Sequence, residues 1–219
     1  MIERLARRRR ALAAALADVG AQGLLVTDPR NIAYLTGFRG SGGVALVDDD
    51  GEAVLCTDSR YELQVVEQAP DVGHVISREY VSGVLGRRRG PADAPLAVEA
   101  DHMTLSAASA LRRALADTGG AATRIVETSG LVEQVRRAKD RAELALIERA
   151  CGVVDEAWTH LLNAGAIAEG RTEREVAADL EHAMRRAGSD GVAFETIDRK
   201  SGSAGMPRPT VTSRMPSSA

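Results

Sequence analysis

A glycine-rich segment over residues 37–43 is the first place in this sequence where residue types and spacing suggest chemistry. Glycine loops bind phosphate when their backbone amides approach the ligand and a helix begins directly after them. This segment has no Gly-Lys-Ser/Thr ending and no Gly-x-Gly-x-x-Gly spacing, and it leads into an apolar run that predicts a strand. We therefore expect a tight connection between strands. Arg39, a charged side chain in this loop, is the candidate substrate-binding residue.

The residues that most often bind metals show no ligand spacing. The four histidines are His74, His102, His160 and His182. The last two fall on predicted helices without a partner at ligand spacing, so we interpret them as surface or hydrogen-bonded core residues. Asp58, Arg60 and Tyr61 cluster at a predicted helix start, where N-capping and a local ion pair explain them. We assign no catalytic residue and no metal ligand in this chain.

Composition excludes several classes of protein. Of the 219 residues, 44% are hydrophobic and 27% charged, which predicts a folded core rather than a disordered chain. The formal net charge of −3 gives no reason to expect a nucleic-acid partner. No apolar run is long enough to span a membrane. Cys56 and Cys151 lie far apart, which favours a reducing cytoplasm in which both are small buried apolar residues.

The first 137 residues alternate between strand-like and helix-like segments. Asp48 to Gly51 predict a hairpin turn, and Asp58 and Thr104 can cap helices. Gly- and Pro-bearing residues 83–95 predict a loop, and an Asp28-Pro29 turn ends the first strand. Apolar runs predict strands at 23–27, 44–47, 52–56, 74–76, 96–99 and 124–127. This order predicts an α/β domain on a mixed sheet.

The N-terminus predicts an amphipathic helix. Leu5, Leu12, Leu16 and Val19 share one helical face, and Gly20 follows as a C-cap. A secretory signal is disfavoured because the apolar stretch is mostly alanine and contains an aspartate. The arginine run over residues 7–10 is then interpreted as a solvated face.

A second unit over residues 138–197 begins with two predicted helices. Asp140 with Glu143, and Thr172 with Glu175, have the spacing of capping boxes. Residues 192–197 predict the start of a strand. Apolar residues recur along the first helix at alternating spacings of three and four, at Leu144, Ile147, Cys151, Val154, Trp158 and Leu161. We expect Trp158 in a core, yet these two helices lack a sheet to pack on, which predicts exposed apolar surface and self-association.

Five segments resemble the creatinase, prolidase and Xaa-Pro aminopeptidase family, in the order in which that family carries them. They are LLVTDPRNIAYLTGFRGSGG at 24–43, CTDSRY at 56–61, RAKDRAELALI at 137–147, GRTEREV at 170–176 and GVAFETI at 191–197. The resemblance implies a creatinase/prolidase-like N-terminal domain over 1–137. It also implies the incomplete start of an α+β pita-bread catalytic domain over 138–197.

The same resemblance implies metal-dependent hydrolysis of a peptide bond preceding proline. In the family, two divalent ions, commonly manganese or cobalt, are bridged by a hydroxide that attacks the scissile carbonyl. Two aspartates, a histidine and two glutamates hold them, after the Phe-Glu-Thr-Ile strand, where a His-x-Arg-Pro segment also helps to bind substrate. The N-terminal domain of such enzymes can lean over a neighbouring subunit's active site, which is where Arg39 would act.

This sequence departs from the family after Ile197. The remaining residues contain no histidine, no glutamate and one aspartate, Asp198, so we expect no metal bound by this chain and no activity of the chain alone. Residues 198–219 predict a disordered tail. If the tail is written with one choice of codons and then read one nucleotide later, it encodes Ser-Ile-Ala-Ser-Pro and Ala-Cys-His-Ala-Arg-Pro. The first resembles the family's continuation of the strand, and the second contains its His-x-Arg-Pro segment. We therefore interpret the tail as translated out of frame.

Three hypotheses follow. The first is a truncated Xaa-Pro peptidase, a family whose intact members act on proline-containing peptides. The second is a non-catalytic binding or dimerisation module, as a homodimer or paired with a full-length family member. The third, a small nucleotide-binding α/β protein, is disfavoured by the missing phosphate-loop residues.

Overall fold

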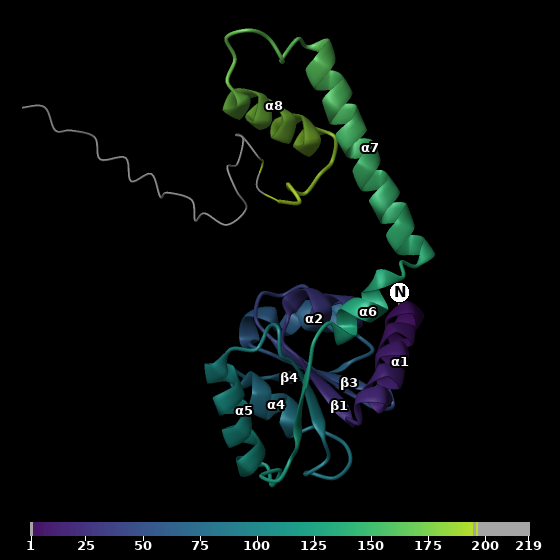
Figure 1. Cartoon of the computed structure of the whole chain (residues 1–219), viewed down its shortest axis with the longest axis vertical. Coiled ribbons are helices and arrows are strands. Elements are labelled where there is room, and N and C mark those ends of the chain that lie inside the picture. The colour runs from purple at the N-terminus through teal and green to yellow at the C-terminus, as the bar shows by residue number, and fades with distance from the viewer. Residues whose placement is uncertain (1, 195, 197–219) are drawn as a thin grey trace, which may run out of the picture. The chain divides into compact units, whose positions relative to one another are not determined.

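The computed structural model describes residues 2–194 and 196, in two compact units that divide after Ala138 (Figure 1). The helices of the first unit are α1 (Ile2–Val19), α2 (Pro29–Thr36), α3 (Glu62–Gln68), α4 (Tyr80–Leu85), α5 (Leu105–Asp117) and α6 (Leu131–Arg137), with a 3₁₀ turn at Ser59–Tyr61. Its strands are β1 (Gly23–Val26), β2 (Val44–Asp48), β3 (Ala53–Thr57), β4 (Gly73–Ile76), β5 (Leu96–Glu99) and β6 (Ile125–Thr128). All six predicted strands are present.

The six strands form one mixed sheet in the order β4-β3-β2-β1-β5-β6. The pairs β1–β2 and β2–β3 are antiparallel, whereas β3–β4, β1–β5 and β5–β6 are parallel. The predicted α/β fold with a mixed sheet is therefore confirmed. The chain runs from β1 outward through β2, β3 and β4 on one side and from β5 to β6 on the other, so the adjacent carboxyl ends of β1 and β5 mark a change in the direction of winding.

Helices cover both faces of the sheet, which explains why the central strands are apolar on both sides. Alternate residues along each strand belong to two different clusters: Leu24 and Val26 pack with α1, α2, α3 and α6, while Leu25 packs with α4 and α5. Figure 1 shows α1 and α6 on one side of the strands and α4 and α5 on the other. The first unit is thus a three-layer sandwich with two apolar cores.

Helix α1 confirms the predicted apolar face but corrects the interpretation of the arginine run. Leu5, Leu12 and Leu16 are buried, as expected, and Arg8 and Arg9 are buried with them. Arg8 donates to Tyr34 O at 3.0 Å and its guanidinium lies 4.1 Å from the Tyr34 ring centroid. Part of the arginine run is therefore inside the fold, because carbonyls at the end of α2 need donors.

Three helices of the first unit were not predicted. Asp28 accepts from Arg30 N and caps α2, with Pro29 at the first helical position, so this pair begins a helix instead of a turn. Helix α6 lies in a segment for which the sequence predicted no helix. A short helix, α4, also extends to Leu85, inside the stretch predicted as a loop.

The buried carboxylate Asp48 gives the fold a pH dependence. It is 7% exposed at the end of β2, and its Oδ1 has no hydrogen-bond partner among the described residues. Burial, and secondarily Asp50, raises the pKa of Asp48 to about 6, while Arg89 and Arg88 act in the opposite direction. A carboxyl whose folded pKa is raised favours the folded state at low pH, and this contribution is lost as the pH rises through 6.

Asp48→Asn should therefore raise the free energy of unfolding by about 1–2 kcal/mol at pH 7.5, because the amide carries no charge to bury. At pH 4 the wild-type carboxyl is mostly protonated when folded, so the gain should largely disappear. Urea denaturation at the two pH values measures the difference. An equal effect at both would show that Asp48 does not titrate as its burial implies.

The second unit contains α7 (Arg141–Asn163) and α8 (Glu173–Arg186), which pack against each other. Both predicted capping boxes are present: the Asp140 side chain accepts from Glu143 N at 2.9 Å, and the Thr172 hydroxyl accepts from Glu175 N at 3.3 Å. Within the described residues of α7, only Ala157 and Leu161 are buried. The expectation of exposed apolar surface is confirmed.

Three expectations for the second unit and the cysteines are wrong. Trp158 is 45% exposed instead of lying in a core, because α8 packs on another side of α7. Residues 192–194 and 196 form no strand, since no paired strand is present among the described residues of this unit. Cys56 is buried, as expected, but Cys151 is exposed on α7.

None of the described helices has the length and apolar character needed to cross a membrane.

Candidate functional site

The glycine-rich loop between α2 and β2 is built by close packing. Gly37 ends α2 with φ +86°, a conformation that side chains other than glycine rarely adopt. A Cβ on Gly40 would lie 2.1 Å from the ring of Phe38, which is itself buried. The loop therefore needs glycine for its own turn and for the close approach to Phe38. The predicted tight connection is present, but it joins helix α2 to β2 and not two strands.

Arg39 lies in this loop directly after Phe38, and its side chain is exposed. Its backbone N–H donates to Gln68 Oε1 at 2.8 Å, which fixes the position of the residue on the side of α3. Among the described residues, its guanidinium has no hydrogen bond or ion pair. Arg39 is thus a free positive charge held on an ordered loop, and no described neighbour gives it a structural role.

A hydrogen-bonded cluster next to this loop confirms the prediction for Asp58, Arg60 and Tyr61. Asp58 caps the 3₁₀ turn and accepts from Arg60 Nε at 2.9 Å, from Arg60 NH2 at 2.8 Å and from Tyr80 OH at 2.5 Å. The hydrogen bonds from Arg60 and then from Tyr80 hold the pKa of Asp58 well below its usual range. The hydroxyls of Tyr61 and Ser41 form a 2.6 Å hydrogen bond, and Ser41 belongs to the glycine-rich loop. The cluster therefore holds this loop against the residues that follow β3.

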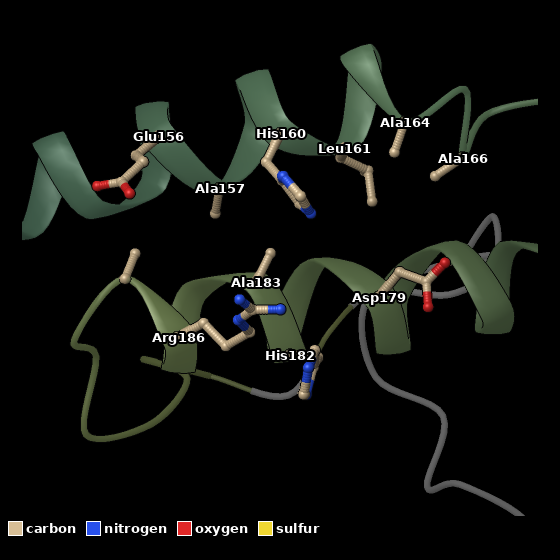
Figure 2. Close-up of a pocket in the computed structure, with 11 residues that line it drawn as sticks. Glu156, Ala157, His160, Leu161, Ala164, Ala166, Asp179, His182, Ala183 and Arg186 are labelled. Carbon is tan, nitrogen blue, oxygen red and sulfur yellow. The ribbon is translucent and has the colours of Figure 1, made fainter.

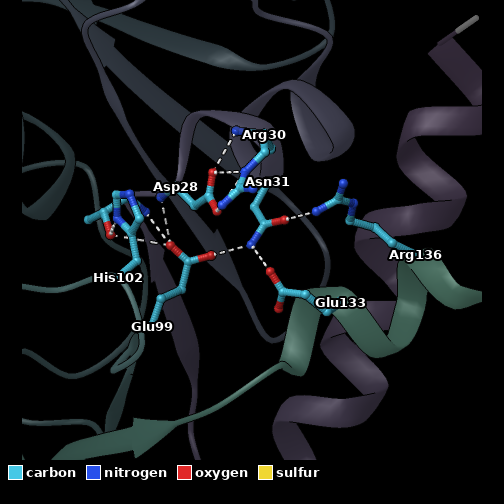
Figure 3. Close-up of polar contacts among 8 residues, drawn as sticks. Asp28, Arg30, Asn31, Glu99, His102, Glu133 and Arg136 are labelled. Atoms are coloured by element: carbon cyan, nitrogen blue, oxygen red, sulfur yellow. Dashed lines mark hydrogen bonds and ion pairs between the residues drawn. The ribbon is translucent and has the colours of Figure 1, made fainter. Parts of the chain in front are cut away.

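The carboxyl ends of β1 and β5 hold a second polar site, which sequence reasoning missed. Glu99, 8% exposed at the end of β5, accepts from Thr27 N at 2.6 Å and from Asp28 N at 2.9 Å with its Oε2 (Figure 3). Its Oε1 accepts from Asn31 Nδ2 at 2.7 Å. The only signal in the sequence was a charged residue, Glu99, as the last residue of an otherwise apolar strand.

Asn31 extends this network to α6. Its Nδ2 also donates to Glu133 Oε1 at 2.7 Å, and its Oδ1 accepts from Arg136 NH1 at 2.9 Å (Figure 3). The side chain is 1% exposed, and both polar atoms of its amide are used. The network therefore joins β5, the start of α2 and the face of α6 through one buried residue.

This arrangement argues against nucleotide binding at the place where doubly wound folds bind ligands. The carboxyl end of β1 is where the winding changes direction, and ligands of such folds bind there, with phosphate at a helix N-terminus. Here the carboxylate of Glu99 already accepts the amides that precede α2. A phosphate would meet a negative charge in its own position, so the site stabilises the fold instead of binding an anion.

The histidines of the second unit do not form a metal site. A cavity of about 290 Å³ between α7 and α8 has Glu156, His160, Asp179 and His182 among its lining residues (Figure 2). Both histidines are exposed, as expected, and in Figure 2 their imidazoles do not point at each other. Within residues 2–194 and 196, no group of three or more His, Cys, Asp or Glu side chains is arranged to hold a metal ion.

Two sequence families match this chain in succession. The creatinase/prolidase N-terminal domain matches residues 8–138, and metallopeptidase family M24 matches residues 145–215. The second match includes residues assigned above to the tail, which lie outside the described part of the chain.

Similar proteins include bacterial peptidases. The uncharacterized peptidase YqhT of Bacillus subtilis is 28% identical over 184 residues, which are 82% of this chain and 49% of the relative. The structure of Xaa-Pro dipeptidase from Bacillus anthracis aligns with a TM-score of 0.75 at 28% identity, over 87% of this chain and 51% of that protein. The chain thus spans about half the length of these relatives.

A separately solved domain matches the first unit. The N-terminal domain of the cytoplasmic peptidase PepQ from Mycobacterium tuberculosis H37Rv aligns with a TM-score of 0.54 at 39% identity. The alignment covers 59% of this chain and 98% of that domain.

Proposed function

This chain belongs to the creatinase/prolidase family, and from that premise we propose that it corresponds to the first half of an Xaa-Pro peptidase. One observation carries the proposal: an N-terminal domain and the start of an M24 domain follow each other here in the order found in a Xaa-Pro dipeptidase. The proposed reaction of the intact enzyme is hydrolysis of a peptide bond preceding proline. The proposed compartment is the cytoplasm, as named for the PepQ relative.

The metal chemistry of the family does not fit the residues at hand. M24 is a metallopeptidase family, but the described residues hold no cluster of metal ligands, and residues 198–219 contain one aspartate and neither histidine nor glutamate. We therefore assign no catalytic residue and no metal ligand to this chain. The proposal is that this chain alone neither binds Mn²⁺ or Co²⁺ tightly nor hydrolyses an Xaa-Pro dipeptide.

DNA sequencing of the locus well past codon 197 is the decisive experiment, combined with calorimetric titration of the chain with Mn²⁺. We expect another reading frame that continues into a His-x-Arg-Pro segment and codons for the Asp, Asp, His, Glu and Glu ligands, and no tight Mn²⁺ binding by the chain itself. If no frame encodes these residues, the peptidase proposal fails. If the chain binds Mn²⁺ tightly as it stands, the proposed inactivity fails.

Arg39 is the residue we propose to face substrate. A free guanidinium on an ordered loop suits the carboxylate of a short proline-containing peptide, because charge-assisted hydrogen bonds to carboxylates are strong. In the intact, in-frame peptidase, Arg39→Ala should leave the melting temperature unchanged and weaken binding of the dipeptide Gly-Pro about tenfold, as expected for the loss of one such bond. Chemical-shift titration measures the affinity. Arg112→Ala, an exposed arginine on α5, is the control, and an equal loss there would remove the assignment.

A further inference from the structure

A small polar pocket lies at the edge of the sheet where β2 ends and where β3 and β4 begin. Its volume is about 220 Å³, below the range of pockets that hold drug-sized molecules, so a ligand bound here must be small. The three strands line it together with the segment that follows α4. Its charged and titratable lining residues are Asp48, Glu52, His74, Arg87 and Arg89.

The carboxylate of Asp48 is the buried acceptor of this pocket. Asp48 lies on the same side of β2 as Val44 and Leu46, because side chains alternate along a strand. The residue is 7% exposed, and within the described part of the chain neither of its carboxylate oxygens accepts a hydrogen bond. A buried charge is normally paired or hydrogen-bonded, because its desolvation is otherwise uncompensated. This carboxylate is therefore available to a donor that enters the pocket.

The arginines closest to Asp48 in charge are engaged elsewhere. Arg88 NH2 donates to Ala94 O at 2.6 Å, and Arg89 NH1 donates to Asp50 Oδ2 at 3.2 Å. Both guanidinium groups lower the pKa of Asp48 from a distance, but neither donates a hydrogen bond to it. The protein thus surrounds this carboxylate with positive charge without neutralising it directly.

Arg87 is the free positive charge of the same pocket. Its side chain is exposed, and among residues 2–194 and 196 its guanidinium forms no hydrogen bond or ion pair, with Asp48 or with any other residue. A simple cation at Asp48 would leave this guanidinium without a partner. A simple anion at Arg87 would lie in a pocket that also holds a buried carboxylate. A molecule that carries both charges satisfies both groups with charge-assisted hydrogen bonds.

We propose that this pocket binds a small zwitterion with ammonium and carboxylate groups, as in a free α-amino acid, whose ammonium donates to Asp48 and whose carboxylate accepts from Arg87. This inference does not rest on the proposed peptidase function. The raised pKa of Asp48 supports it, since a carboxyl perturbed by burial beside a pocket is typical of functional sites. A carboxylate that lowers the stability of the fold is also what a binding role would maintain.

Glycine is the probe, because it has both charged groups and no side chain. Chemical-shift titration of the full ¹⁵N-labelled chain at pH 7.5 measures its binding. We expect a dissociation constant on the order of 1 mM, as suits a ligand of so few atoms, and shifts centred on Asp48, Gly73 and Arg87. Methylamine and acetate each carry one of the two groups, so each should bind about tenfold more weakly than glycine.

Two variants and two matched controls locate the site. Asp48→Asn, which should fold more stably than the wild type, and Arg87→Ala should each weaken glycine binding about tenfold. Asp49→Asn changes the next, exposed residue of the turn, and Arg112→Ala changes an exposed arginine on α5; both should leave the affinity unchanged. Melting temperatures check that all four variants are folded.

Three results would overturn the proposal. The first is the absence of saturable glycine binding to the wild-type chain. The second is an equal loss of affinity in the control variants, which would indicate a general effect of charge. The third is methylamine binding as tightly as glycine, or undiminished glycine binding by Arg87→Ala, since either would leave a cation site at Asp48 without a role for the carboxylate of the ligand.

Discussion

Arg9→Met is expected to lower the free energy of unfolding of the first unit by about 3–4 kcal/mol, the range for breaking a buried charged network. Arg9 is 4% exposed in α1. Its Nε donates to Gly51 O at 3.1 Å, its NH1 to Leu35 O at 3.1 Å and its NH2 to Asp71 Oδ2 at 2.8 Å. Methionine keeps the apolar stem but removes the donor from two buried carbonyl oxygens and from the partly buried carboxylate of Asp71.

Arg10→Met provides the matched control. Arg10 is the next residue of the same helix, its side chain is 57% exposed and it pairs with Glu3, which is 86% exposed. Exposed ion pairs of this kind contribute about 0–1 kcal/mol. Urea denaturation of both variants, followed by far-UV circular dichroism, gives the comparison. If the two substitutions lower the free energy of unfolding equally, the hydrogen bonds of Arg9 do not stabilise the contacts of α1 with α2, the hairpin turn and Asp71.

The position of Arg9 could have been predicted from the sequence more fully than it was. Arg8 and Arg9 follow Leu5 by three and four residues and precede Leu12 by four and three, so both share the apolar face of α1. A run of like charges favours a solvated face, whereas the spacing of the leucines places two of these arginines on the buried one. The carbonyls that receive these arginines belong to α2, a helix that the sequence analysis did not predict.

Local signals were the most reliable guide to the fold. Both capping boxes of the second unit and the strand from Leu96 to Glu99 are present as predicted, because they depend on residues close together in the chain. The pair Asp28-Pro29 has two local interpretations, a turn or a cap with proline at the first helical position. Glu99, which accepts the amides of Thr27 and Asp28, favours the helix, and this partner lies more than 70 residues away.

The second unit shows where an apolar pattern alone is insufficient. The repeat from Leu144 to Leu161 predicted a helix with one seam, and the helix is present. Which side of α7 packs on α8 depends on the small side chains of both helices, among them Ala157 and Ala183, which permit a close approach. Leu144, Ile147 and Trp158 of the repeat remain exposed, which is the exposed apolar surface predicted for this unit.

Glu99→Ala is expected to lower the free energy of unfolding of the first unit by about 3 kcal/mol. The substitution leaves the amides of Thr27 and Asp28 and the Nδ2 of Asn31 without this acceptor, and buried donors that lose a charged partner cost about 1–3 kcal/mol each, partly recovered by water. Glu127→Ala, at an exposed position on the adjacent strand β6, is the control and should cost no more than about 0.5 kcal/mol.

Hydrogen exchange distinguishes the network from a simple loss of packing at Glu99. Asn31 donates to both Glu99 and Glu133 and accepts from Arg136, so releasing it should loosen α6 as well as the start of α2. We expect faster amide exchange over Leu131–Arg137 in Glu99→Ala and unchanged exchange there in Glu127→Ala. Because α6 is the last element before the chain enters the second unit, the buried carboxylate at the end of β5 then determines how firmly the first unit holds its own C-terminal helix. If α6 exchanges normally in Glu99→Ala, Asn31 does not transmit the effect, and Glu99 acts on α2 alone.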